Sequence, residues 1–209
     1  MVLSKKELKG LLQKYGKKYS EQLGIKLEGA RKGELFKWFI ASYLFGKRIG
    51  EKIAVRTYFQ FGKDGLLSLE KARRASWEDF VHSLDEGGYV RYDFSTADKL
   101  LVVMRMLRGY GGDLNRMHGK AADARDLERR LMEFPGVGPV TANIFLRELR
   151  GIWEKADPEM GPLARKAMRR LGIKDAKGYW RKNGIKGYDF VSFEAMLTRY
   201  GKEKRRGGL

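Results

Sequence analysis

Apolar residues recur with a helical period through most of this chain, and the alternation typical of strands is hard to find. The strongest segment is 33–45, whose wide apolar face consists of Leu35, Phe36, Phe39, Ile40, Tyr43 and Leu44. This face is too rich in aromatic side chains for a helix exposed to water. We therefore expect a central, buried helix here.

Further amphipathic segments predict helices on both sides of this one. Ser76 with Asp79, and Ser95 with Asp98, have the spacing of N-cap pairs. The expected helices cover residues 50–61, 76–84, about 99–107, about 123–134, 162–171 and 191–200. The pattern predicts an all-α fold with a central helical domain at 34–149 and a second helical lobe formed by 1–33 and 150–209.

The net charge of the chain gives information about its binding partner. The 209 residues include 44 Lys and Arg against 26 Asp and Glu, which gives a net charge of +18. Such a field attracts polyanions, so nucleic acid is the first candidate partner. A surface charged only for solubility is the alternative, although such surfaces usually balance the two signs.

Composition also limits the chemistry. Cysteine is absent, which excludes disulfides, thiol nucleophiles and cysteine-held zinc or iron–sulfur centres. The two histidines, His82 and His118, are far apart in sequence, so we expect no histidine-based metal centre or triad. Catalysis would then depend on carboxylates, lysines or tyrosines. No apolar run is long enough for a membrane span and the N-terminus lacks an apolar signal core, so we expect a cytoplasmic protein without a membrane partner.

The segment "FPGVGPVTANIF" (134–145) interrupts the helical pattern with two glycines and two prolines. Pro135 would stop the preceding helix, Gly136 and Gly138 would allow a tight reversal, and Pro139 suits the first position of the next helix. The free amides at that helix start would suit a phosphate. A plain helical hairpin, with glycines that only make the turn, is the alternative.

The stretch "LMEFPGVGPVTANIFL" resembles the "L-P-G-[VI]-G-x-x-T-A" hairpin of the helix-hairpin-helix DNA glycosylases, the endonuclease III superfamily. The segment "LFKWFIASYLFGKRIGEKIAVRTY" resembles that family's first core helix, the following turn and the next helix. The resemblance covers about residues 34–157. It implies a two-lobed all-α fold that acts as a monomer on double-stranded DNA, flipping a damaged or mismatched base out of the helix. The hairpin residues that would grip the DNA are Gly136, Val137, Gly138, Val140 and Thr141.

The resemblance also implies one ion. A potassium or sodium ion would be held by the backbone carbonyls of Met132, Phe134 and Val137. No other cofactor is expected, and the iron–sulfur cluster of many family members is excluded by the lack of cysteine.

In the family a catalytic aspartate follows the hairpin, and Asp157 in "EKADPEM" matches it best. Many members carry a Schiff-base lysine where this chain has Val140, so the resemblance implies a monofunctional glycosylase that uses water. Glu159 is a rival for the catalytic role. A non-catalytic DNA-binding module, and a glycosylase that also cuts the strand with an unaligned lysine such as Lys155, remain alternatives.

Two further segments carry candidate DNA contacts. Lys47 and Arg48 in "LFGKRIG" lie where family members insert a side chain into the gap left by the flipped base, or they are a solvated charge pair. In "EGGYVRYDF" (86–94), Tyr89, Arg91 and Tyr92 could stack on a base. Core packing of the tyrosines is the alternative. The identity of the damaged base is not encoded in any of these motifs.

Overall fold

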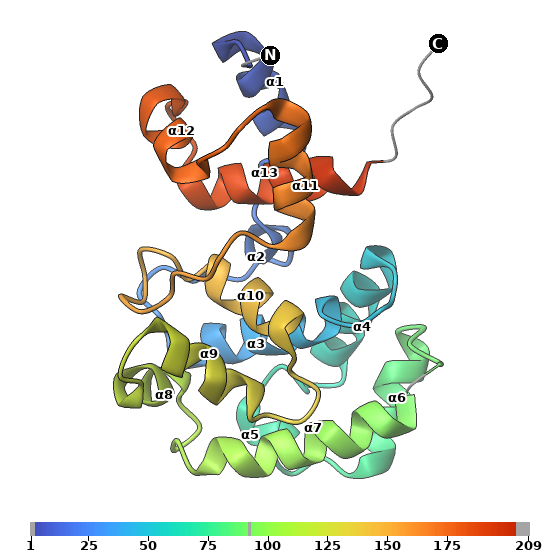
Figure 1. Ribbon diagram of the computed structural model, residues 1–209. Coiled ribbons are helices and arrows are strands. Elements are labelled where there is room, and N and C mark those ends of the chain that lie inside the picture. The colour runs from blue at the N-terminus through green and yellow to red at the C-terminus, as the bar shows by residue number, and fades with distance from the viewer. Residues whose placement is uncertain (1–2, 92, 204–209) are drawn as a thin grey trace. The chain divides into compact units, whose positions relative to one another are not determined.

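The computed structural model describes residues 3–91 and 93–203 (Figure 1). All regular structure in these residues is helical, so the expected all-α class is confirmed. The helices are α1 (Lys5–Tyr15), α2 (Tyr19–Gln22), α3 (Lys32–Phe45), α4 (Glu51–Lys63), α5 (Leu69–Ala72), α6 (Trp77–Glu86), α7 (Asp93–Arg108), α8 (Leu114–Lys120), α9 (Ala124–Met132), α10 (Pro139–Arg147), α11 (Pro162–Leu171), α12 (Ala176–Asn183) and α13 (Phe190–Lys202).

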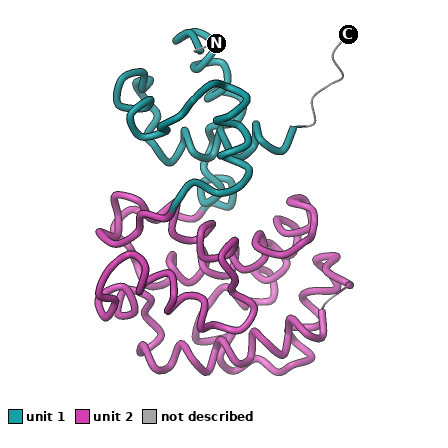
Figure 2. The backbone as a smooth tube through the Cα atoms, in the orientation of Figure 1, with its two compact units in different colours: residues 1–24, 159–209 teal, residues 25–158 magenta. Residues whose placement is uncertain are grey.

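The chain forms two compact units (Figure 2). Unit 1 comprises Met1–Gly24 with Glu159–Leu209, and unit 2 comprises Ile25–Pro158. The sequence analysis placed these boundaries at 33/34 and 149/150, and the structure moves both outward. Asn115 explains the shift, because its side chain donates to the Ala30 carbonyl (2.8 Å) and accepts from the Trp153 indole (2.9 Å). Both flanking segments are thereby anchored to unit 2.

Helix α3 is the buried centre of unit 2, as its apolar face predicts. Leu35, Phe36, Phe39, Ile40, Tyr43 and Leu44 are all at most 2% exposed. Helix α3 packs against α4, α8 and α10. The Trp38 indole donates to the Phe145 carbonyl of α10 (3.0 Å), and the Phe39 ring lies edge-on to Phe134 and Phe145. These contacts fix the segment between α9 and α10 against α3.

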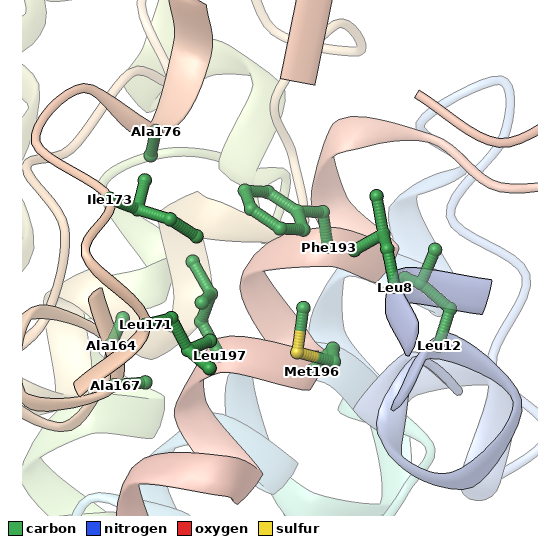
Figure 3. Packing of buried hydrophobic residues seen from close by; sticks show 10 residues of the cluster. All are labelled: Leu8, Leu12, Ala164, Ala167, Leu171, Ile173, Ala176, Phe193, Met196 and Leu197. Carbon is green, nitrogen blue, oxygen red and sulfur yellow. The ribbon is translucent and has the colours of Figure 1, made fainter. Parts of the chain in front are cut away.

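Helix α13 has the corresponding position in unit 1. It packs against α1, α11 and α12. Figure 3 shows the core, in which Phe193, Met196 and Leu197 of α13 meet Leu8 and Leu12 of α1. Side chains from α11, α12 and the turn between them complete it: Ala164, Ala167, Leu171, Ile173 and Ala176. A single buried helix therefore organises each unit.

The two predicted N-cap pairs had different outcomes. Ser76 and Asp79 form a reciprocal capping box at the start of α6, with backbone-to-side-chain distances of 2.8 and 3.1 Å. The prediction for Ser95 and Asp98 was wrong, because α7 already begins at Asp93 and both residues lie inside it. Asp98 instead accepts a hydrogen bond from the Trp77 indole at 3.0 Å.

No helix among the described residues has both the length and the apolar character needed to cross a membrane.

Candidate nucleic-acid interface at the hairpin

The α9–α10 connection is a tight turn, as the glycines and prolines predict. Helix α9 ends at Met132, two residues earlier than expected, and the Val137 amide donates to the Phe134 carbonyl at 3.0 Å. Gly136 has a φ of 82°, a value that side chains disfavour. Pro139 is the first residue of α10, where its missing N–H costs nothing.

Two side chains from the end of α3 and the turn after it hold this hairpin. The Tyr43 hydroxyl donates to the Pro135 carbonyl at 3.2 Å, and the Lys47 ammonium donates to the Gly136 carbonyl at 2.7 Å. A Cβ on Gly136 would lie 2.2 Å from the Tyr43 hydroxyl oxygen and 2.7 Å from Lys47 Nζ. Glycine is therefore required here both for its backbone angle and for the space it leaves.

Lys47 is electrostatically unusual. Its ammonium lies 4.0 Å from the centre of the Tyr43 ring. Burial, with a smaller contribution from the nearby charge of Lys99, lowers the pKa of Lys47 to about 8. A phosphate bound close by would stabilise the charged ammonium and raise this pKa again.

The start of α10 presents backbone donors. Its N-cap is Gly138, which has no side chain to cap the helix, and the N–H groups of Gly138 and Val140 donate to no described residue. A Cβ on Gly138 would meet nothing within 4 Å, and the Val140 side chain is 54% exposed. The side chains of Val137 and Thr141 are buried, so these two residues can offer only backbone groups. Gly138 and Val140 thus offer two open amides at the positive end of a helix dipole.

The expected cation ligands are compatible with the turn. Among the described residues, nothing donates a hydrogen bond to the carbonyls of Met132 and Val137. The Phe134 carbonyl already accepts from Val137 N–H, which leaves its second lone pair. Such carbonyls suit a monovalent cation rather than a transition metal.

Comparisons with family models, curated proteins and solved structures found no match. The resemblance of the hairpin therefore depends on the quoted residues alone.

Asp157 lies near the end of unit 2 and is held in place by Arg150. The Arg150 guanidinium donates to Asp157 Oδ1 and also to the Pro158 carbonyl. The Arg150 side chain is 8% exposed, whereas that of Asp157 is 51% exposed. One buried cation therefore orients a carboxylate that remains accessible to solvent.

The rival residues have different surroundings. The Glu159 side chain is 96% exposed and its carboxylate lies 3.7 Å from Arg165, both in unit 1. Lys155 Nζ donates to the carbonyls of Ala121 (2.6 Å) and His118 (3.2 Å). An ammonium tied to two carbonyls is poorly suited to attack a sugar.

In the second predicted DNA-contacting loop, the structure supports the alternative of core packing for Tyr89. Tyr89 is only 2% exposed and offers no ring face to a base. The reason is the end of α6: Gly88 has a φ of 84°, its N–H donates to Asp85 and that of Tyr89 donates to Leu84, which is a Schellman motif. This motif directs the following apolar residue, here Tyr89, back onto the helix. Arg91 is exposed, and Tyr92 lies outside the described residues.

Two apolar side chains of the segment 86–94 are exposed, one before α7 and one in its first turn. Val90 is 68% exposed, and Phe94 is 58% exposed with its ring centre 5.3 Å from that of Trp77. In the α3–α4 turn, Arg48 is exposed and contacts no described residue through a hydrogen bond or ion pair, unlike Lys47.

Sequence reasoning missed three residues of this arrangement. Tyr43 was assigned to the core, and only its hydroxyl contact reveals its second role. Arg150 has no motif that would distinguish it from the other arginines of the chain. Phe94 lies in the first turn of α7, and no motif in the sequence marks it as exposed.

Proposed function

We propose that this protein is a DNA repair glycosylase, which flips a damaged or mismatched base out of double-stranded DNA and hydrolyses its N-glycosidic bond. The main support for the proposal is the hairpin. Hydrogen bonds from Tyr43 and Lys47 hold its turn, and the amides of Gly138 and Val140 that follow are open. This geometry suits one phosphate of a DNA backbone. Lys47 and Arg48 would add positive charge beside it.

Asp157 has the role of the catalytic carboxylate in this proposal. When the bond between the base and sugar C1′ breaks, positive charge develops on the sugar, and a fixed carboxylate stabilises it. A water molecule adds its oxygen to C1′, one of its protons passes to solvent or to Asp157, and the base leaves with a proton. The hydrogen bond from Arg150 keeps the carboxylate pointing in one direction. Its exposed fraction leaves room for the sugar and the water.

The reaction is proposed to stop at the abasic site. Val140 supplies no amine at the start of α10, and Lys155 is tied to two carbonyls. A potassium or sodium ion on the carbonyls of Met132, Phe134 and Val137 would stabilise the hairpin without entering the chemistry. The protein is proposed to act as a cytoplasmic monomer.

The test uses a panel of duplexes that carry uracil, mismatched thymine, 8-oxoguanine, oxidised pyrimidines, hypoxanthine or alkylated purines. Each reaction is divided, and one half is heated in alkali, which cuts the strand at abasic sites. We expect one class of lesion to give strand cleavage only after alkali. A parallel reaction with borohydride traps any Schiff base between the protein and the sugar.

Two results would contradict this proposal in different ways. Cleavage without alkali, together with a trapped adduct, would mean that a lysine performs strand cleavage, and Lys47 with its lowered pKa would be the first to substitute. Salt-sensitive DNA binding without excision of any lesion would favour the non-catalytic module.

A further inference from the structure

The positive charge of the chain is concentrated in one unit. Unit 1 carries 20 Lys and Arg against 7 Asp and Glu, whereas the larger unit 2 carries 24 against 19. Most of the net charge of +18 therefore belongs to the unit that lacks the hairpin. Charge of one sign at this density repels itself and destabilises a small fold. A bound polyanion would remove that cost.

Part of this charge lies on two adjoining helices, α1 and α12. The Tyr179 hydroxyl of α12 donates to the Leu3 carbonyl just before α1 (3.4 Å), so α12 lies beside the beginning of α1 (Figure 1). Five exposed cations of these helices, none of which forms an ion pair with a described residue, define what we name the α1–α12 surface: Lys5, Lys6, Lys9, Arg181 and Lys182.

These five cations are not neutralised by neighbours. Within the described part of the chain, no salt bridge joins any of them to an acidic side chain. The acid nearest to Lys5, Lys6 and Lys9 in the sequence is Glu7, which accepts hydrogen bonds from the Ser4 amide (2.8 Å) and the Ser4 hydroxyl (2.7 Å) at the start of α1. By contrast, Asp126 in unit 2 pairs with both Arg129 and Arg130.

The character of the surface indicates its partner. All large hydrophobic side chains that are exposed in the described residues belong to unit 2: Phe59, Val90, Phe94, Met132 and Val140. Binding into a membrane surface needs an exposed apolar face, and unit 1 presents none in its described residues. Phosphates of a nucleic-acid backbone need only positive charge.

We propose that the α1–α12 surface of unit 1 is a second DNA-binding site, which holds the phosphates of duplex DNA without reading its sequence. It would add affinity through the release of counterions and leave recognition of the base to unit 2. The proposal does not depend on base excision, because any undamaged duplex is a ligand for this surface.

The experiment measures binding of the full chain to an undamaged duplex by fluorescence anisotropy, between about 50 and 200 mM salt. The test variant carries Lys5→Gln, Lys6→Gln, Lys9→Gln, Arg181→Gln and Lys182→Gln. The plot of log affinity against log salt should become shallower by about three to five units, since each phosphate contact contributes about one. Affinity near physiological salt should fall at least about tenfold.

A matched control distinguishes a local DNA-binding site from a general effect of the net charge. It removes five exposed cations of unit 2, none of which makes a salt bridge with a described residue: Lys63, Lys71, Arg105, Arg108 and Arg125, each changed to Gln. We expect this control to lose clearly less affinity and less salt dependence than the unit 1 variant. Circular dichroism melting verifies that both variants fold.

Three results would overturn the proposal. The unit 1 variant could keep the salt dependence of the wild type, or the control could lose as much as the test variant. The test variant could also lose binding to anionic phospholipid vesicles while its DNA affinity is unchanged. None of these results bears on excision, so a protein without glycosylase activity could still have this surface.

Discussion

The two units differ in the apolar side chains that they expose and in the net charge that they carry. Unit 2 exposes apolar side chains, braces a turn through Tyr43 and Lys47 and keeps its charges near balance. Unit 1 carries most of the excess positive charge, and its described residues expose no large hydrophobic side chain. Fixed geometry suits recognition and chemistry, whereas diffuse charge suits affinity for any duplex. The comparison therefore predicts that variants in the two units will fail in different assays.

The largest effect should come from Asp157→Asn. We expect excision to slow by about 10³-fold, within the range for loss of a catalytic carboxylate, because an amide cannot stabilise the cationic sugar. DNA affinity should stay within about threefold of the wild type, since Asp157 contacts no phosphate in this account. Single-turnover excision and anisotropy measure the two quantities. Equal excision by both proteins would exclude Asp157 from catalysis.

Removal of the Arg150 side chain should have an intermediate effect. In Arg150→Met the carboxylate of Asp157 loses the guanidinium that orients it. We expect excision to slow by about 10- to 100-fold, as a misplaced catalytic group does. A purely structural role would lower the melting temperature without changing the excision rate of the folded fraction, so both are measured together.

Alanine substitutions at two glycines of the hairpin should have different effects on the free energy of unfolding. Gly136→Ala forces a Cβ onto the Tyr43 hydroxyl at a φ of 82° and should cost about 3 kcal/mol of unfolding free energy. Gly138→Ala meets no atom within 4 Å and should change stability by less than about 1 kcal/mol. It should nevertheless weaken DNA binding about tenfold, because its methyl group blocks the approach of a phosphate. Denaturant unfolding measures the stability of both variants, and fluorescence anisotropy measures their DNA affinity. Similar stabilities for Gly136→Ala and Gly138→Ala would contradict the close contact of Tyr43 and Lys47 with the hairpin.

Lys47 should produce the smallest effect, which depends on pH. Its pKa of about 8 lies below the usual value, so the folded state loses its proton before the unfolded chain does. Stability should therefore rise from pH 8 upwards in the wild type relative to Lys47→Met. The contribution of Lys47 to DNA affinity should fall over the same range, because the free protein loses that charge. Parallel pH profiles for the wild type and Lys47→Met would contradict this assignment.

The sequence predicted the parts of the site that depend on local pattern. The apolar face of α3 and Pro139 at the start of α10 follow from helical periodicity and from the fixed φ of proline. The sequence left Tyr89 undecided between a DNA contact and core packing, because a Schellman motif turns it inward. It gave no indication of Arg150, because the partner of this residue lies seven positions away outside any helix. Both depend on how the chain leaves a helix, which periodicity does not describe.

The most direct test of the account is an NMR titration of the ¹⁵N-labelled protein with an undamaged duplex. We predict the largest shifts in unit 2 at the amides of Gly138 and Val140, which gain a phosphate acceptor, together with broad, salt-sensitive shifts on the α1–α12 surface. If the hairpin amides stay unchanged at saturating DNA while other residues shift, the hairpin does not hold the backbone and the proposed function loses its main support.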